Sequence, residues 1–161
     1  MKIFVINLLR SPDRKKIFDD YNSNYISYEY IEAIDGKLLD RNNLSSDIIN
    51  KDTCIFRDGY LGSALSHLKL WYKCIELDEP IIIIEDDAIV NKNFNKYLEI
   101  ILNQLPSNFD IVQLFYNFDH CLSYQVTNYE IANTRFTNKN ITKEDIELFR
   151  IKDINPSIAK L

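Results

Sequence analysis

The stretch Ile81-Ile82-Ile83-Ile84-Glu85-Asp86-Asp87 decides the fold class of this 161-residue chain. Its four isoleucines are β-branched and do not alternate with polar residues. This pattern predicts a strand covered on both faces, as in the centre of a parallel or mixed sheet. Three adjacent carboxylates follow the strand at once, although their charges repel one another. Because open α/β sheets bind ligands at the carboxyl ends of their strands, the stretch also predicts ligand chemistry at this edge.

Helical and strand patterns alternate on both sides of this stretch, which predicts one α/β domain with a mostly parallel central sheet. Ser11 is the expected N-cap of the first helix, and Pro12 lies in its first turn. The pair Asp35-Gly36 predicts a turn. The expected strands are 3–9, 25–34 and 109–115, and the expected helices are 12–21, 43–50, 62–78, 93–105 and 142–149.

The helix predicted at 62–78 has the clearest periodicity, and Pro80 ends it. Its apolar residues recur about every 3.6 positions and should form one apolar face. These residues are Leu65, Leu68, Trp71, Cys74, Ile75 and Leu77.

Composition and charge exclude several classes of protein. The net charge is -5 and the sequence pI is about 5.0, which argues against a generally basic nucleic-acid binder. Cys54, Cys74 and Cys121 are widely spaced and form no CxxC pair, so neither a zinc site nor a disulfide framework is predicted. No apolar run approaches the roughly 18 residues of a membrane span, and no secretion signal is recognisable. We therefore expect a cytoplasmic protein.

The acidic triplet Glu85-Asp86-Asp87 is the most informative chemical feature. Oxygen ligands of this kind suit Mg²⁺ or Mn²⁺, and a metal held there could neutralise a diphosphate. The alternative is a solvated acidic turn that caps the following segment.

Two further groups of residues could bind a nucleotide. The segment Gly59–His67 holds two of the three glycines and precedes the predicted helix, where free N–H groups could meet an anion. Asn7, Arg10 and Arg14 follow the first strand, and the two guanidinium groups could bind a base or phosphates. A simple turn, a structural His67 and a solvated loop are the alternatives.

Taken together and in order, these pieces resemble glycosyltransferase family 25, which includes the lipooligosaccharide galactosyl- and glucosyltransferases. The similarity covers roughly residues 1–118. It is carried by residues 3–8 with 10–14, by 32–36, by 59–67 running into Leu70-Trp71, by 84–87, and by 110–114.

The resemblance implies a GT-A-like nucleotide-binding sandwich and a UDP-galactose or UDP-glucose donor. It implies that Asp87 holds Mn²⁺ (or Mg²⁺) against the diphosphate, while Glu85 or Asp86 contacts the ribose or a metal-bound water. Glu85 is accordingly a predicted metal ligand beside Asp87. The residues expected to bind the nucleotide-sugar are Asn7, Arg10, Arg14, Asp35, Gly59, Gly62, Ser66, His67 and Asp86.

The resemblance weakens after residue 120. We therefore expect a nucleotide-sugar-binding domain at 1–120 and a poorly matched segment of the same domain at 121–161. A catalytic base is not assigned, since Asp110 and Asp119 are only the nearest acids. Ser63 stands where the family has a Cys. We expect transfer of a hexose to lipooligosaccharide or another saccharide, with peripheral contact to the inner membrane face. The alternative is an inactive, truncated nucleotide-binding remnant.

Overall fold

The computed structural model describes residues 1–45, 57–114, 121–125, 131–135 and 142–151. The chain forms two compact units, Met1–Ile89 and Val90–Leu161, and each is described by itself. None of the helices in the described ranges is both long enough and apolar enough to cross a membrane.

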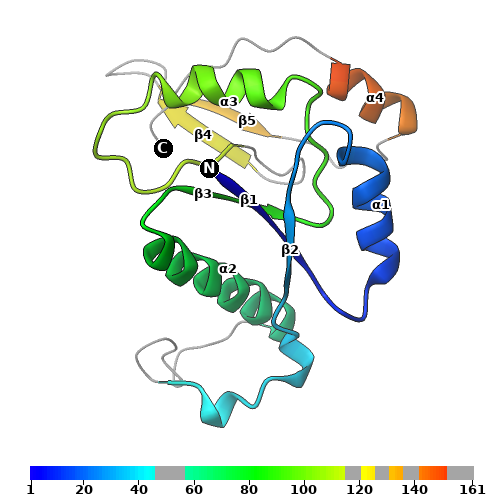
Figure 1. The fold of residues 1–161 in the computed structure, drawn as a ribbon, viewed down its shortest axis with the longest axis vertical. Coiled ribbons are helices and arrows are strands. Elements are labelled where there is room, and N and C mark those ends of the chain that lie inside the picture. Colours follow the sequence, from blue (N-terminus) through cyan, green and yellow to red (C-terminus); the bar gives the residue numbers. More distant parts are fainter. Residues whose placement is uncertain (46–56, 115–120, 126–130, 136–141, 152–161) are drawn as a thin grey trace. The chain divides into compact units, whose positions relative to one another are not determined.

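The first unit is built on a parallel sheet with the strand order β2-β1-β3 (Figure 1). Its strands are β1 (Lys2–Asn7), β2 (Glu29–Glu32) and β3 (Ile81–Glu85). This arrangement confirms the predicted α/β class with a parallel sheet and is consistent with a GT-A-like nucleotide-binding fold. Among the described strands, however, β1 is central and β3 lies at an edge, so the predicted central place of β3 was wrong. The burial explains the difference, because β1 is buried over four successive residues and β3 only at alternate ones.

The helices α1 (Pro12–Asn22) and α2 (Asp58–Leu77) pack on opposite faces of this sheet. Successive side chains of a strand point to opposite faces. Phe4 and Ile6 of β1 form a core cluster with Leu70 of α2. On the other face, Phe18 of α1 makes an edge-to-face contact with Tyr30 of β2. The sheet is therefore sandwiched between two helices.

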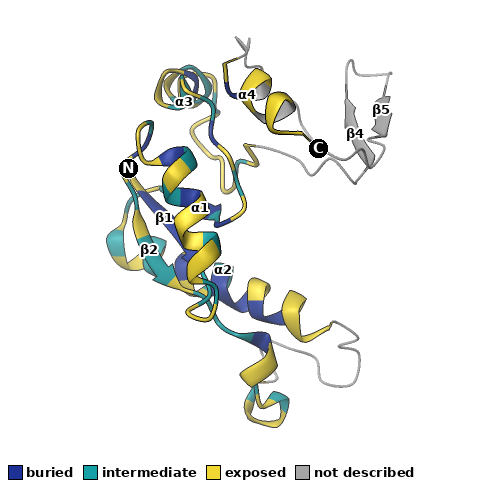
Figure 2. Ribbon diagram, turned by 90° about the vertical axis from the view of Figure 1, so that its right-hand side faces the viewer, coloured by how far each residue is buried: buried dark blue, intermediate teal, exposed yellow. Residues whose placement is uncertain are grey.

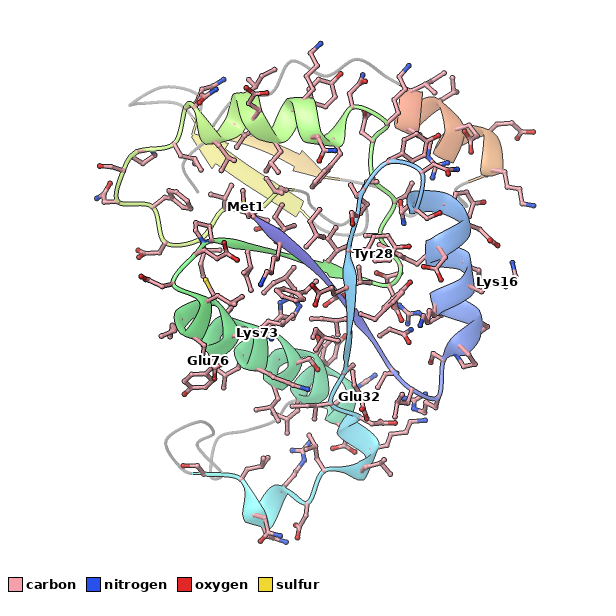
Figure 3. The ribbon with its side chains drawn as sticks, in the orientation of Figure 1. Met1, Lys16, Tyr28, Glu32, Lys73 and Glu76 are labelled. Carbon is pink, nitrogen blue, oxygen red and sulfur yellow. The ribbon has the colours of Figure 1, made fainter. Side chains whose placement is uncertain are left out.

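Tyrosines tie α1 to the β2 side of the sheet (Figure 3). The hydroxyls of Tyr28 and Tyr30 donate to Asp19 Oδ1 at 2.5 and 2.9 Å. Burial, followed by this carboxylate, raises the pKa of Tyr28 to about 12. Strand β2 is shorter than the predicted 25–34, because the amides of Tyr25 and Ile26 bond to the carbonyl of Asn22 and prolong the turn after α1.

The predicted turn at Asp35-Gly36 is confirmed. Asp35 caps a 3₁₀ helix, η1 (Gly36–Leu38), and its carboxylate accepts from the amide of Lys37. A second 3₁₀ helix, η2 (Arg41–Asn43), follows. Most of the short helix predicted at 43–50 lies outside the described residues.

Helix α2 begins four residues before the predicted start at 62, so that Gly59 and Gly62 lie inside it. Its buried residues are Leu61, Gly62, Leu65, Ser66 and Leu70. The predicted apolar face was wrong in part, because Trp71 is 47% exposed and Ile75 is 73% exposed. Gly62 brings the helix close to the backbone of Ile34 and Gly36 after β2. Figure 2 shows buried residues (dark blue) on one side of α2 and exposed residues (yellow) on the other.

The second unit contains α3 (Phe94–Leu102), the antiparallel strands β4 (Cys121–Gln125) and β5 (Ile131–Arg135), and α4 (Lys143–Ile151). The two helices predicted in this unit are confirmed, but the β4-β5 pair was not predicted from the sequence. The strand predicted at 109–115 was wrong over the described residues 109–114, which are irregular and mostly exposed. A strand needs a paired neighbour, and this apolar run has none among the described residues.

Candidate functional site

The carboxyl ends of β1 and β3 carry two separate clusters, one on each face of the sheet. Asn7 and Asp86 point to the side of α1, whereas Glu85, one residue earlier, points to the side of α2. All of these residues belong to the first unit. We call the two groups the α1-side cluster (Asn7, Arg14, Asp86 and Asp87) and the α2-side cluster (Ser63, His67 and Glu85).

The α1-side cluster is organised around Asp86, which is only 7% exposed. Asn7 donates from Nδ2 to Asp86 Oδ2 at 2.6 Å and to the carbonyl oxygen of Ser11 at 3.2 Å. Arg14 reaches from α1, pairs with Asp86 Oδ1 and lies 3.1 Å from Asp87 Oδ2. One guanidinium thus joins two adjacent carboxylates, which lowers their mutual repulsion.

Asn22, at the end of α1, fixes the turn that follows β3. Its side chain is fully buried and donates from Nδ2 to the carbonyl oxygen of Ala88 at 3.0 Å. The amide of Ala88 in turn bonds to the carbonyl oxygen of Glu85 at 3.0 Å. Helix α1 therefore holds the acidic turn at both of its ends, through Arg14 and Asn22. Sequence reasoning missed Asn22, because nothing in its neighbourhood marks it.

The α2-side cluster is organised around Glu85 Oε1. Ser63 Oγ donates to this oxygen at 3.1 Å, and His67 Nε2 lies 3.0 Å from it. The hydrogen bond with His67 is the largest cause that lowers the pKa of Glu85 below its ordinary value. Glu85 is therefore ionised at neutral pH, and its charge stands on the other side of the sheet from Asp86.

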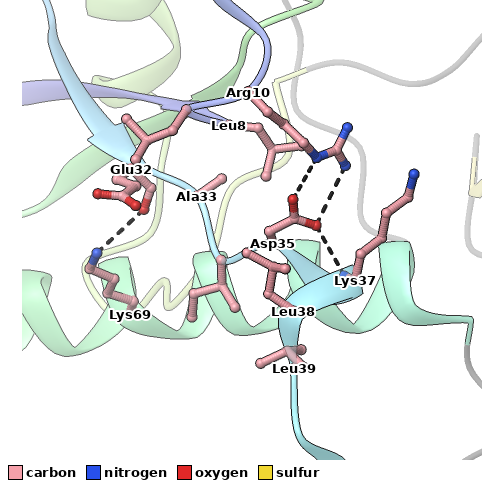
Figure 4. A pocket seen from close by; sticks show the side chains of 11 residues that line it. Leu8, Arg10, Glu32, Ala33, Asp35, Lys37, Leu38, Leu39 and Lys69 are labelled. Atoms are coloured by element: carbon pink, nitrogen blue, oxygen red, sulfur yellow. Dashed lines mark hydrogen bonds and ion pairs between the residues drawn. The ribbon is translucent and has the colours of Figure 1, made fainter.

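A pocket of about 650 Å³ opens between the ends of β1 and β2, η1 and α2 (Figure 4). Arg10 donates from Nε to Asp35 Oδ2 at 2.5 Å across it. This guanidinium holds the pKa of the Asp35 carboxyl below its usual range. Lys69 donates to the carbonyl oxygen of Glu32 at 3.3 Å. Leu8, Leu9, Ala33, Ile34, Leu38 and Leu39 also line the pocket, which therefore combines an apolar wall with charged groups.

Gly62 and Ser66 hold α2 against the loop after β2. A Cβ at Gly62 would lie 2.5 Å from the carbonyl oxygen of Ile34. Ser66 Oγ accepts from the amide of Ile34 at 2.8 Å and donates to the carbonyl oxygen of Gly62 at 2.7 Å. A Cβ at Gly59, by contrast, would have no neighbouring atom within 4 Å. The contacts of Gly62 and Ser66 position the pocket wall, and their predicted contact with the nucleotide-sugar stays a prediction.

The acidic triplet does not converge on one point. Glu85 and Asp86 lie on opposite faces, and the described residues contain no group of three or more acidic, His or Cys side chains placed to hold a metal ion. Asp87 has an exposed side chain, at 66%, which leaves it open to solvent. Mg²⁺ commonly binds one or two carboxylates together with substrate phosphates. Asp87 therefore fits a divalent cation that is also bound by a diphosphate. The assignment of Glu85 as a metal ligand stays a prediction.

Neither of the two predicted catalytic candidates belongs to the first unit. Asp110 belongs to the second unit and is exposed within the irregular segment 109–114. Asp119 lies outside the described residues. Neither assignment is tested by the geometry of the first unit.

Known proteins similar to this chain point to one family. The profile of glycosyltransferase family 25 (LPS biosynthesis protein) matches residues 1–159. The R655 protein of Acanthamoeba polyphaga mimivirus is 32% identical over 111 residues, covering 65% of this chain and 34% of its own length. The lipooligosaccharide biosynthesis protein lic2B of Haemophilus influenzae is 25% identical over 134 residues, covering 78% of this chain and 50% of its own length.

A further relative is named as lacking activity. The "Probable inactive glycosyltransferase 25 family member 3" of Bos taurus is 27% identical over 116 residues, covering 66% of this chain and 20% of its own length. The matched regions therefore span between a fifth and a half of these relatives. Because the family profile covers nearly the whole sequence, this chain belongs to glycosyltransferase family 25.

Proposed function

We propose that this chain transfers a hexose, galactose or glucose, from a UDP-sugar to a saccharide acceptor in a metal-dependent reaction. The α1-side cluster carries the proposal. It brings Asn7 from β1, Arg14 from α1 and the pair Asp86-Asp87 from the end of β3 to one point at the carboxyl edge of a parallel sheet. Such an edge is where open α/β sheets bind nucleotides.

The pocket at the ends of β1 and β2 suits the nucleoside of the donor. Its apolar wall would cover the flat base, and Arg10 and Asp35 would offer a donor and an acceptor of hydrogen bonds. Arg14 would lie beside the diphosphate, since a guanidinium matches phosphate oxygens in two parallel hydrogen bonds. Asp86 and Asn7 would keep Arg14 in place. Asp110 and Asp119 are the predicted candidates for the base that takes the proton of the acceptor hydroxyl.

We propose Asp87 as the residue that holds Mn²⁺ or Mg²⁺. A bound divalent cation supplies Lewis-acid stabilisation of the negative charge that develops on the departing UDP. The exposed carboxylate of Asp87 supports this assignment, and so does its ion pair with the guanidinium of Arg14, a cationic group.

The acceptor we propose is a lipid-linked saccharide such as lipooligosaccharide, because the Haemophilus influenzae relative is named for its biosynthesis. The reaction would take place in the cytoplasm, at the inner face of the membrane. A non-catalytic nucleotide-binding protein is the second candidate. The Bos taurus relative favours it by its name.

Calorimetry of UDP binding, with and without Mn²⁺, tests the donor site. We expect Mn²⁺-dependent binding by the unchanged chain and a loss of that dependence in Asp87→Asn. Asp20→Asn is the matched control, because Asp20 is an exposed aspartate of α1 whose single ion pair within the described part of the chain is with Lys16. No UDP binding by the unchanged chain would refute the proposal.

Turnover separates the two candidates once UDP binding is established. Slow hydrolysis of UDP-galactose or UDP-glucose, or transfer to a saccharide acceptor, is expected of an enzyme. Tight UDP binding without either reaction, for both donor sugars and with Mn²⁺ present, would support the non-catalytic protein instead.

A further inference from the structure

The face of α2 that points away from the sheet carries large aromatic side chains. Tyr60, His67 and Trp71 recur at intervals of seven and four residues, which places them within about 40° of one another around the helix. Tyr60 is 68% exposed and Trp71 is 47% exposed. Both aromatic side chains are therefore accessible to a ligand from solvent.

Hydrogen-bonding groups lie between the two aromatic rings along the helix. Glu85 reaches this side from β3 and meets Ser63 and His67 through Oε1 alone. Among the described residues, neither Oε2 of Glu85 nor Nδ1 of His67 has a hydrogen-bond partner. A carboxylate can only accept hydrogen bonds, so Oε2 of Glu85 is placed to meet a donor group of a ligand.

This combination matches the chemistry of a sugar chain. A pyranose ring has faces of C–H groups that stack on aromatic rings, and its edge of hydroxyls both donates and accepts hydrogen bonds. Tyr60 and Trp71 stand about 16 Å apart along the helix axis, which leaves room for a short oligosaccharide between them. Glu85 and His67 lie in that interval, where the hydroxyls would be.

We propose that this outer face of α2, formed by Tyr60, Ser63, His67 and Trp71 with Glu85, binds the saccharide acceptor. The inference rests on the proposed function for the role of the saccharide as acceptor. It assigns the donor to the α1-side cluster and the pocket at the ends of β1 and β2, and the acceptor saccharide to the outer face of α2.

The chain offers a direct probe, because Trp71 is its only tryptophan. Tryptophan fluorescence should change on titration with lactose, saturate, and stay unchanged with equal concentrations of glycerol. We expect Tyr60→Ser to weaken lactose binding at least about tenfold. Tyr72→Ser is the matched control, because Tyr72 is also an exposed tyrosine of α2, at 56%, but lies about a third of a turn away.

Three outcomes would overturn the inference. The fluorescence change could fail to saturate, it could saturate equally in Tyr60→Ser, or it could be lost equally in both tyrosine variants. A concentration-dependent dimer in analytical ultracentrifugation, with no response to lactose, would identify the face as a contact between copies of the chain instead.

UDP calorimetry on the same samples keeps this inference apart from the proposed function. UDP binding without any lactose response would overturn the acceptor site and leave the donor site intact. Saturable lactose binding without UDP binding would support a saccharide site and refute the proposed transferase. Both tyrosine variants should melt at the temperature of the unchanged chain, because the two side chains are exposed.

Discussion

The α1-side cluster and the α2-side cluster begin at neighbouring residues of one strand end, yet their environments differ. Asp86 is buried, accepts from a neutral amide and pairs with a guanidinium. Glu85 is half-exposed and is held by a serine hydroxyl and an imidazole. The alternation of side chains along β3 is enough to separate them.

The difference shows that neighbouring residues of the acidic triplet can make different kinds of contact on the two faces of the sheet. On the α1 side, one guanidinium pairs with two carboxylates, and one of these is buried. On the α2 side, a serine hydroxyl and one imidazole nitrogen meet a half-exposed carboxylate. We therefore expect the α1-side cluster to contribute more to the free energy of unfolding than the α2-side cluster does.

The largest effect should come from breaking the α1-side cluster. Arg14→Met leaves the buried carboxylate of Asp86 with the amide of Asn7 as its only neighbour named above. Removing one partner of a buried pair typically costs about 3–5 kcal/mol. Because the Arg14 side chain is 43% exposed and water can partly replace it, we expect a loss of about 2–3 kcal/mol in the free energy of unfolding, measured by urea denaturation.

Two controls test this interpretation. Lys16→Met removes a cation from the same helix, but its pair with Asp20 is exposed, so the loss should stay below about 0.5 kcal/mol. In an Asp86→Asn background, Arg14→Met should cost clearly less than in the unchanged chain. Equal costs in the two backgrounds would show that Arg14 stabilises the fold without Asp86.

Sequence reasoning located the strands and helices of the first unit and named Asn7, Arg14 and Asp86 as candidates for nucleotide binding, and the structure brings these three side chains together. Both predictions follow from local signals, namely an apolar strand, a proline at a helix start and the rule that ligands gather at the carboxyl ends of parallel strands. It could not separate Glu85 from Asp86. That separation depends on which face of β3 each residue takes, and the face is set by packing against α1 and α2 rather than by the residues themselves.

The next effect concerns the packing that positions the α2 side. Gly62→Ala would place a methyl group 2.5 Å from the carbonyl oxygen of Ile34 and force α2 away from the loop after β2. Overpacking of this kind costs about 1–3 kcal/mol, and we expect that loss in urea denaturation. The shift should also weaken UDP binding, since Ile34 lines the pocket.

Gly59→Ala is the matched variant. Its new methyl group meets nothing within 4 Å, so it should stabilise the helix by about 0.5–1 kcal/mol because alanine loses less backbone entropy than glycine. Equal effects of the two substitutions would contradict the close approach at Gly62.

The same small residues explain why the face of α2 was predicted only in part. Periodicity alone favoured the side with the largest apolar residues, Leu68, Trp71 and Ile75. The structure instead buries the side with Gly62 and Ser66, where backbone approach and a serine hydrogen bond replace side-chain volume. A pattern that counts only apolar residues cannot detect a contact made by glycine and serine.

A smaller effect should appear in the pH dependence of the α2 side. His67 lowers the pKa of folded Glu85 below its ordinary value near 4.5. The resulting stabilisation is therefore present above about pH 4.5 and is lost as the pH falls through the folded pKa. Because Glu85 is half-exposed, Glu85→Gln should cost less than about 1 kcal/mol at pH 7 and nothing measurable near pH 3, in parallel urea titrations. A cost that grows on acidification would contradict the assigned direction.

The smallest effect should come from replacing Ser11. This substitution distinguishes the role of its backbone carbonyl from that of its hydroxyl. Ser11 occupies the predicted N-cap of α1 but makes no side-chain capping hydrogen bond. Its carbonyl oxygen instead accepts from Asn7, the same amide that holds Asp86. Ser11→Ala keeps that carbonyl, so we expect a change below about 0.5 kcal/mol, less than the roughly 1 kcal/mol typical of a lost cap. Asn7→Ala, which removes both hydrogen bonds, should cost more in the same thermal or urea measurement. A loss of a full cap in Ser11→Ala would show that its hydroxyl, and not the backbone, secures the start of α1.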